Sequence, residues 1–133
     1  MRKDTAEKVA NLLAAVATTL RQYGRPRKYP GCWRDEALTA WGNPCRARHP
    51  NAVKWSLLGA LKADAKALGY SNHVLRRAML ALLNADTIDH WYWDDSQLHA
   101  AIRNMDNYYY DTRHIIRFVE AAQKAAERQA VAA

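Results

Sequence analysis

The stretch from Pro50 to Gly69 constrains the fold more than any other part of the chain. Apolar side chains recur along it at the spacing of one helical face: Val53, Leu57, Ala60, Leu61, Ala65 and Leu68. Asn51 is predicted to cap the start of this helix, and Gly69 is predicted to end it. Gly59 lies inside the helix, where glycine costs about 1 kcal/mol relative to alanine. We therefore expect a central helix that other elements pack around, with a second backbone passing close to Gly59.

The rest of the chain indicates further helices. Periodic apolar residues predict helices over residues 4–23, 72–85, 95–105 and 112–125. No segment alternates convincingly between apolar and polar residues, so no strand is expected. The predicted fold is all-α: a compact bundle of about four main helices that forms a single domain over residues 1–133. The alanine-rich end, residues 126–133, is expected to fray.

Polar residues that can accept a hydrogen bond stand before three of these helices. Ser71 is predicted to cap the helix that follows it. Asp95 or Ser96 is predicted to cap the short helix, and Asp111 or Thr112 the last one.

The composition indicates a cytoplasmic protein. No apolar run reaches the roughly 20 residues that cross a bilayer, and the start of the chain lacks the apolar core of a signal peptide. Cys32 and Cys45 are expected to be reduced thiols there, although a bridge between them is geometrically possible. Cys32, Cys45 and His49 do not match a known metal-ligand spacing. We predict no metal site and no cofactor.

A long irregular loop is predicted over residues 24–50, which hold all four prolines of the chain. A short helix from about Trp33 to Trp41 fits inside it, with Leu38 and Trp41 turned inward. The window from Arg21 to Lys54 holds eight basic and two acidic residues, so it carries +6 of the net charge of +7. This concentration of charge indicates an anionic partner.

Aromatic residues are interleaved with the basic ones in this loop. Arginine grips phosphates or carboxylates with two hydrogen bonds, and aromatic rings stack on unpaired bases. The mixture suits RNA, single-stranded DNA or an acidic protein surface. The alternative is a solvated basic loop whose tryptophans anchor it to the core. These loop residues are predicted to contact the partner: Arg25, Arg27, Lys28, Tyr29, Arg34, Arg46 and Arg48.

Three consecutive tyrosines, Tyr108, Tyr109 and Tyr110, precede the last helix. Tyrosine is rigid, amphipathic and enriched at interfaces, so this run is predicted to be a partner-binding edge or half of a dimer contact. The alternative is that the rings fill gaps between helices with their hydroxyls at the surface.

An enzymatic role rests on one short segment. His90, Asp94 and Asp95 are of the residue types that perform acid–base chemistry. The alternative is that Asp94 or Asp95 caps a helix while the neighbouring tryptophans pack. No nucleophile motif and no glycine-rich phosphate loop is present in the sequence.

The order of several residues resembles a family of small uncharacterised helical domains found in actinobacteria and phages. The residues that carry the resemblance are Trp33, Ala37, Gly42, Ala52, Trp55, Ser56, Gly59, Ala60, Leu61, Asp106, Asn107, Thr112 and Ile115. Ser56 stands where the family often has cysteine, and the pair Asp106-Asn107 is reversed, so no site chemistry is carried over. The resemblance implies a helical fold and no activity. Phage carriage suggests by analogy a host-directed or counter-defence role.

Together these observations favour a non-enzymatic binding module that contacts an acidic protein surface, as a phage-type accessory protein acting on a host complex would. The alternative is an RNA- or DNA-binding protein that uses the basic aromatic loop. A second alternative is an enzyme with an Asp/His site.

Overall fold

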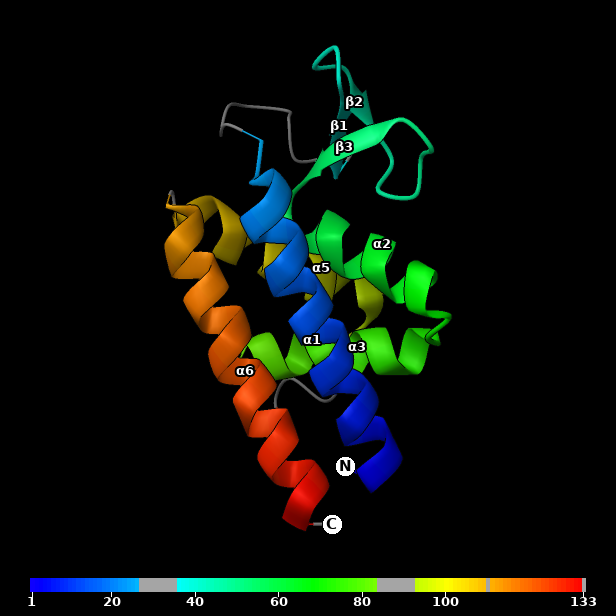
Figure 1. Ribbon diagram of the computed structural model, residues 1–133, viewed down its shortest axis with the longest axis vertical. Coiled ribbons are helices and arrows are strands. Elements are labelled where there is room, and N and C mark those ends of the chain that lie inside the picture. Colours follow the sequence, from blue (N-terminus) through cyan, green and yellow to red (C-terminus); the bar gives the residue numbers. More distant parts are fainter. Residues whose placement is uncertain (27–35, 84–92, 110, 133) are drawn as a thin grey trace.

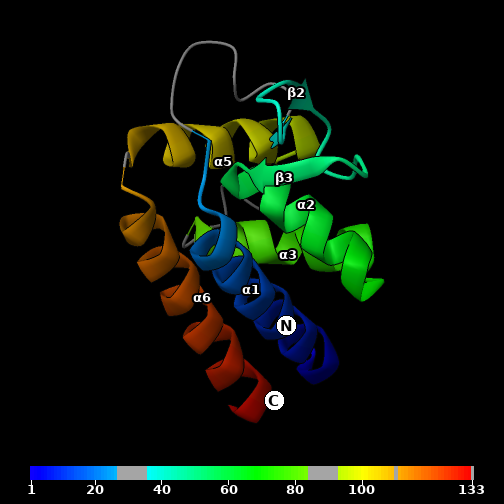
Figure 2. The same ribbon diagram turned by 45° about the horizontal axis from the view of Figure 1, so that its top comes forward.

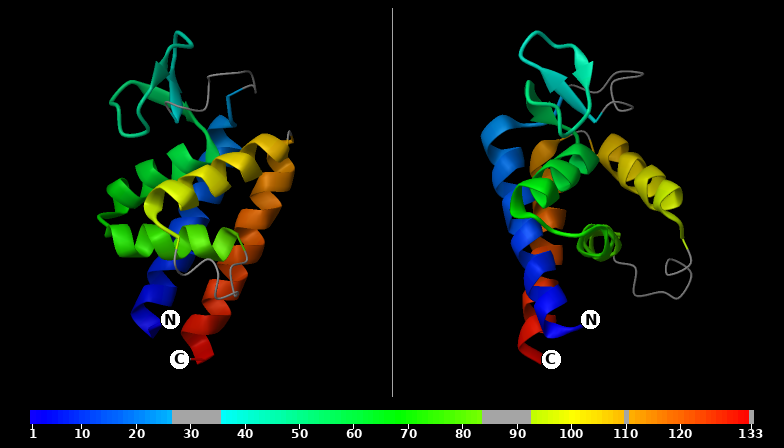
Figure 3. Two further views of the ribbon diagram at one scale, coloured as in Figure 1. Left: turned by 180° about the vertical axis from the view of Figure 1, so that it is seen from behind. Right: turned by 90° about the vertical axis from the view of Figure 1, so that its right-hand side faces the viewer.

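Two long antiparallel helices form one layer of the molecule, and three shorter helices pack across one face of it (Figures 1 and 3). The long helices are α1 (Lys3–Tyr23) and α6 (Thr112–Ala132); the shorter ones are α2 (Leu57–Leu68), α3 (Asn72–Leu82) and α5 (Asp95–Tyr108). The computed structural model describes residues 1–26, 36–83, 93–109 and 111–132. These residues are predominantly helical, which confirms the predicted fold class.

The α1–α6 pair is held by small and aliphatic residues. The stripe Val9, Leu13 and Val16 of α1 is fully buried, as its spacing predicts. The expectation that residues 126–133 fray is wrong for residues 126–132. They continue α6, because Ala126 and Ala130 are buried and their small side chains let the two helices lie close together.

Helix α2 begins later than predicted. Ser56, and not Asn51, caps it: the Ser56 Oγ accepts a hydrogen bond from the Gly59 amide at 3.0 Å. Gly69 ends it in the left-handed conformation, as expected. The predicted close approach at Gly59 is confirmed, because a Cβ added there would lie 2.1 Å from the backbone oxygen of Glu36.

A small antiparallel sheet occupies much of the segment predicted to be a loop, so the expectation of no strands is wrong. Its strands β1 (Ala37–Thr39), β2 (Pro44–Cys45) and β3 (Ala52–Trp55) lie in the order β2–β1–β3. The helix predicted over residues 33–41 is also wrong for residues 37–41, which form β1 and a turn. Figures 1 and 2 show the sheet at the end of the molecule opposite the two termini.

Trp55 attaches the sheet to the helical body. Its ring packs edge-on against Tyr23 at the end of α1, with ring centroids 5.4 Å apart. Its Nε1 donates to the backbone oxygen of Ala47 at 2.9 Å. Ala37, Cys45 and Trp55 are register partners, so their side chains share the face that meets the body. Lys54 and Pro44 are exposed on the opposite face, which also carries their register partner Leu38, a buried residue.

The remaining helix starts agree with the sequence to within a residue. Ser71 caps α3, accepting from the Val74 amide at 3.4 Å. Asp94, one residue before the predicted cap, begins α5 with a reciprocal pair of hydrogen bonds to Gln97. The Asp111 carboxylate accepts from the Arg113 amide at 2.9 Å at the start of α6. No helix in the described residues has both the length and the apolar content of a membrane span.

Candidate functional site

Arg25, predicted to bind a partner, is buried inside the protein. Its side chain is 4% exposed and forms an ion pair with Asp106, whose side chain is 2% exposed. The guanidinium also donates to the backbone oxygens of Asp106 (2.9 Å) and Tyr109 (2.7 Å) and to the Thr112 hydroxyl (3.1 Å). This placement removes Arg25 from the surface that a partner can reach.

The buried pair joins four elements. Arg25 follows α1, and its acceptors lie at the end of α5 and the start of α6. The second carboxylate oxygen of Asp106 accepts from the Leu57 amide at 3.3 Å, at the first residue of α2. A carboxylate at a helix N-terminus is also favoured by the helix dipole. Arg25 and Asp106 therefore have a structural role.

Several predicted site residues lie outside the described residues. They are Arg27, Lys28, Tyr29, Arg34 and Tyr110, together with Cys32 and His90 of the disulfide and enzyme hypotheses.

The sheet and its connections expose an aromatic ring and three cations, which we call the basic sheet: Trp41, Arg46, Arg48 and Lys54. The expectation that Trp41 points inward is wrong, because it lies in the turn between β1 and β2 and is 91% exposed. Leu38 is buried as expected. Arg46, Arg48 and Lys54 are exposed, and residues 37–55 contain no acidic residue. The surface is therefore strongly positive with an accessible indole.

The base of the sheet is fixed to α2 by Glu36. This residue has a φ of 72°, and its backbone oxygen accepts from the Ser56 amide (2.9 Å) and hydroxyl (3.1 Å). Its buried carboxylate forms an ion pair with Lys62. Glu36 is the acidic residue nearest the basic sheet in the sequence, and its charge is balanced by Lys62 of α2. These contacts also hold the strands in one position relative to the helices.

The two described tyrosines of the predicted edge differ in position. Tyr108 is 79% exposed. Tyr109 is half-buried, with its ring 4.7 Å from Phe118 and 4.9 Å from Tyr108 between centroids. Tyr109 therefore fills a gap between α5 and α6, while Tyr108 remains available at the surface.

The described part of the proposed Asp/His site has structural contacts. Asp94 caps α5, as the alternative interpretation predicts. Asp95 accepts from Asn72 Nδ2 (3.3 Å) and Arg76 Nη1 (3.4 Å), which joins α3 to the start of α5. Among the described residues, no three His, Cys, Asp or Glu side chains are grouped as metal ligands.

His99 on α5 is a titratable group that the sequence did not single out. Burial lowers its pKa, and the positive charges of Lys62 and Arg103 lower it further, while Asp95 and Glu36 act in the opposite direction. The imidazole is therefore neutral near pH 7. A histidine half-buried between cations has no signature in the sequence, because Lys62 is brought to it by the tertiary fold.

Comparison with protein-family models, with curated proteins and with solved structures finds no match to this chain. The resemblance to the family of small helical domains therefore stays a prediction.

Proposed function

We propose that this protein is a non-enzymatic binding module whose basic sheet binds single-stranded nucleic acid. The observation that carries the proposal is the nearly complete exposure of Trp41 on a segment, residues 37–55, that also exposes three cations and contains no acid. Large aromatic side chains are usually buried in a small domain. An indole that is exposed to solvent on a positive surface therefore indicates a binding site.

Each residue type has a defined task in such a complex. An exposed ring that stacks on a base contributes about 1–3 kcal/mol. Arg46, Arg48 and Lys54 would neutralise phosphates and release their counterions. Ala47, between the two arginines, is buried, and its backbone oxygen is held by Trp55. The arginines are therefore presented from a fixed backbone.

A single strand suits this surface better than a duplex. Bases in a duplex are stacked on each other, and a lone indole reaches a base face only where the bases are unstacked. The basic sheet also has no helix positioned to enter a major groove, which is the usual route to sequence readout in a duplex.

A second candidate partner is an acidic protein surface, the function that the sequence favoured. Tryptophan and arginine also dominate protein–protein hot spots, and Tyr108 offers a further exposed ring. A phage-type accessory or counter-defence role acting on a host complex belongs to this candidate.

The test is fluorescence anisotropy of labelled oligothymidylate and oligouridylate of about 20 nucleotides, long enough to cover one site. Affinity should fall steeply between about 50 and 200 mM salt. Changing Arg46, Arg48 and Lys54 together to alanine should reduce the slope of log affinity against log salt by about 2, since each single-strand phosphate contributes roughly 0.7. Trp41→Ala should weaken binding about 5- to 150-fold without altering the slope, because stacking is worth about 1–3 kcal/mol.

A matched control removes three exposed cations elsewhere: Arg117, Lys124 and Arg128 of α6, a helix outside the sheet. This triple alanine variant lowers the net charge equally and should bind almost as wild type does. Equal loss in both triple variants would mean non-specific attraction by net charge. No binding to either oligonucleotide at low salt would reject the nucleic-acid proposal and leave the acidic protein surface as the candidate.

A further inference from the structure

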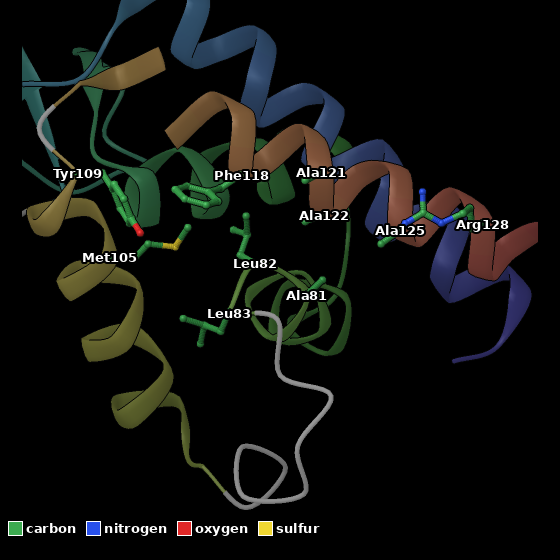
Figure 4. Close-up of a pocket in the computed structure, with 10 residues that line it drawn as sticks. All are labelled: Ala81, Leu82, Leu83, Met105, Tyr109, Phe118, Ala121, Ala122, Ala125 and Arg128. Carbon is green, nitrogen blue, oxygen red and sulfur yellow. The ribbon is translucent and has the colours of Figure 1, made fainter. Parts of the chain in front are cut away.

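A groove of about 530 Å³ lies between α3, α5 and α6 (Figure 4). It is lined by Leu82 at the end of α3 and Leu83 directly after it, by Met105 of α5, and by Phe118 and Ala122 of α6, so its surface is mainly apolar. The lining is partly open to solvent: Phe118 is 37% exposed, and Leu83 and Met105 are half-buried. Arg128 stands at one end of the groove and Tyr109 at the other.

The groove is elongated along α6. Its lining residues on that helix, from Phe118 to Arg128, recur at intervals of three and four residues. Ten residues at 1.5 Å each span about 15 Å, the length of nearly three helical turns. Three of the lining residues here are alanines, at positions 121, 122 and 125, which leave room for the backbone of another helix to come close.

A row of cations runs along α6, and one of its members, Arg128, lines the groove. Arg117, Lys124 and Arg128 are spaced by seven and four residues, so they form one line along α6 beside the apolar stripe. All three are exposed, and none forms an ion pair within the described residues. The acids of α6 lie further round the helix, where Glu120 pairs with Arg21 at 2.7 Å and Glu127 accepts from Gln123.

We infer that this groove binds an acidic amphipathic helix of a protein partner. The apolar face of that helix would cover Phe118 and Met105, and its carboxylates would face the row of cations. An amphiphile with a single anionic head, such as a fatty acid, would use one cation and leave the other two unused. The groove shares no residue with the basic sheet, so this inference stands apart from the nucleic-acid proposal.

The test is selection from a displayed library of peptides about 18 residues long, or roughly five helical turns. The library fixes an apolar helical stripe drawn from Leu, Met, Ile, Val and Phe, and randomises the flanking positions equally between Glu and Lys. Selection is performed on wild type, on Phe118→Asp, and on two charge-reversed proteins. In one of these Arg117, Lys124 and Arg128 become Glu; in the other Arg46, Arg48 and Lys54 become Glu. Both carry the same net charge.

Wild type should enrich peptides with Glu along one flank of the apolar stripe. Measured as free peptides, these should bind Phe118→Asp and the α6-reversed protein at least tenfold more weakly, and the sheet-reversed protein as they bind wild type. The α6-reversed protein, whose changes are all at exposed positions, should enrich Lys on the same flank. Circular dichroism checks that each variant is folded.

Results of three kinds would overturn the inference. One is that no enriched peptide loses affinity on the Phe118→Asp protein. Another is that enriched peptides show no excess of Glu, or that the two charge-reversed proteins weaken them equally. The third is that dodecanoate binds in the groove while no peptide does, which would identify a lipid site instead.

Discussion

Replacing Arg25 with methionine should destabilise the protein more than any single change at its surface. Methionine keeps an unbranched chain that reaches about as far as the arginine Nε, but it removes the charge and all the donors. The substitution leaves the buried Asp106 carboxylate without its guanidinium partner, while the Leu57 amide still donates to it. It also strips a partner from the backbone oxygens of Asp106 and Tyr109 at the end of α5, where carbonyls lack intrahelical donors.

The magnitude follows from the burial of the pair. Removing one partner of a buried ion pair costs about 3–5 kcal/mol, because the charge left behind has lost its compensation. The hydrogen bonds lost at the two backbone oxygens are counted within this figure and not added to it, because the buried groups act as one network. Against a total of about 5–15 kcal/mol for a folded domain, Arg25→Met should remove roughly a fifth or more of the free energy of unfolding.

The assay is urea unfolding followed by far-ultraviolet circular dichroism, with Arg21→Met as the matched control. Arg21 lies one turn earlier on α1 and pairs with Glu120, but the two side chains are 52% and 40% exposed. Such a surface pair contributes about 0–1 kcal/mol. The two variants lose the same charge from the same region. The difference between their free energies of unfolding therefore reports the effect of burying the ion pair.

Similar unfolding midpoints for Arg25→Met and Arg21→Met would refute this reasoning. A double variant, Arg25→Met with Asp106→Leu, provides a second check. It should be more stable than Arg25→Met alone, because it removes the uncompensated carboxylate. Simple additivity of the two losses would mean that the carboxylate and guanidinium are not energetically coupled.

Three further predictions concern stability. Gly59→Ala should lower the free energy of unfolding by about 1–3 kcal/mol, measured in urea, because its new Cβ would overlap the backbone oxygen of Glu36. Asp94→Ala should cost about 0.5–2 kcal/mol in the same assay by removing the cap of α5, while a serine at that position should restore most of it. Burial raises the pKa of Asp64, and the hydrogen bond from Thr19 (2.8 Å) offsets only part of this. The folded state therefore binds more protons than the unfolded state just above pH of about 4, so the contribution of Asp64 to stability falls as pH rises through that region. Asp64→Asn should remove this fall, and an unchanged pH profile of the urea midpoint would contradict it.

The sequence predicted those features that depend on local chemistry. Gly69 and Ser71 stop and start helices through their own backbone and side chain, and both were placed correctly. The cost of a glycine inside a helix correctly indicated that another backbone passes beside Gly59. Helical periodicity correctly located the buried stripe of α1, because the residues that share a helical face are close together in the sequence.

The sheet escaped prediction because its strands are too short to show alternation. β1 has three residues and β2 has two. In β3, Val53 happens to stand four residues before Leu57, which mimics a helical repeat and moved the predicted cap from Ser56 back to Asn51.

The candidate site was predicted only in part, because charge in a sequence does not specify exposure. Arg46 and Arg48 lie at the surface as expected. Arg25 does not, because its partner Asp106 lies 81 residues away and only the tertiary fold brings them together. Trp41 was expected inside because a short helix was predicted over residues 33–41, whereas it lies in the turn between β1 and β2 and is exposed.

The pairing of α1 with α6 also determines where tags, fusions and linkers can be attached to the protein. Lys3 and Glu7 line a common hollow with Ala130 and Val131, so both ends of the chain emerge side by side, remote from the sheet (Figure 1). An affinity tag or fluorescent fusion at either end leaves the Trp41 turn unobstructed. Immobilisation through either terminus would present the same face to solution, and a short linker joining the two ends would yield a circular permutant that can be reopened elsewhere.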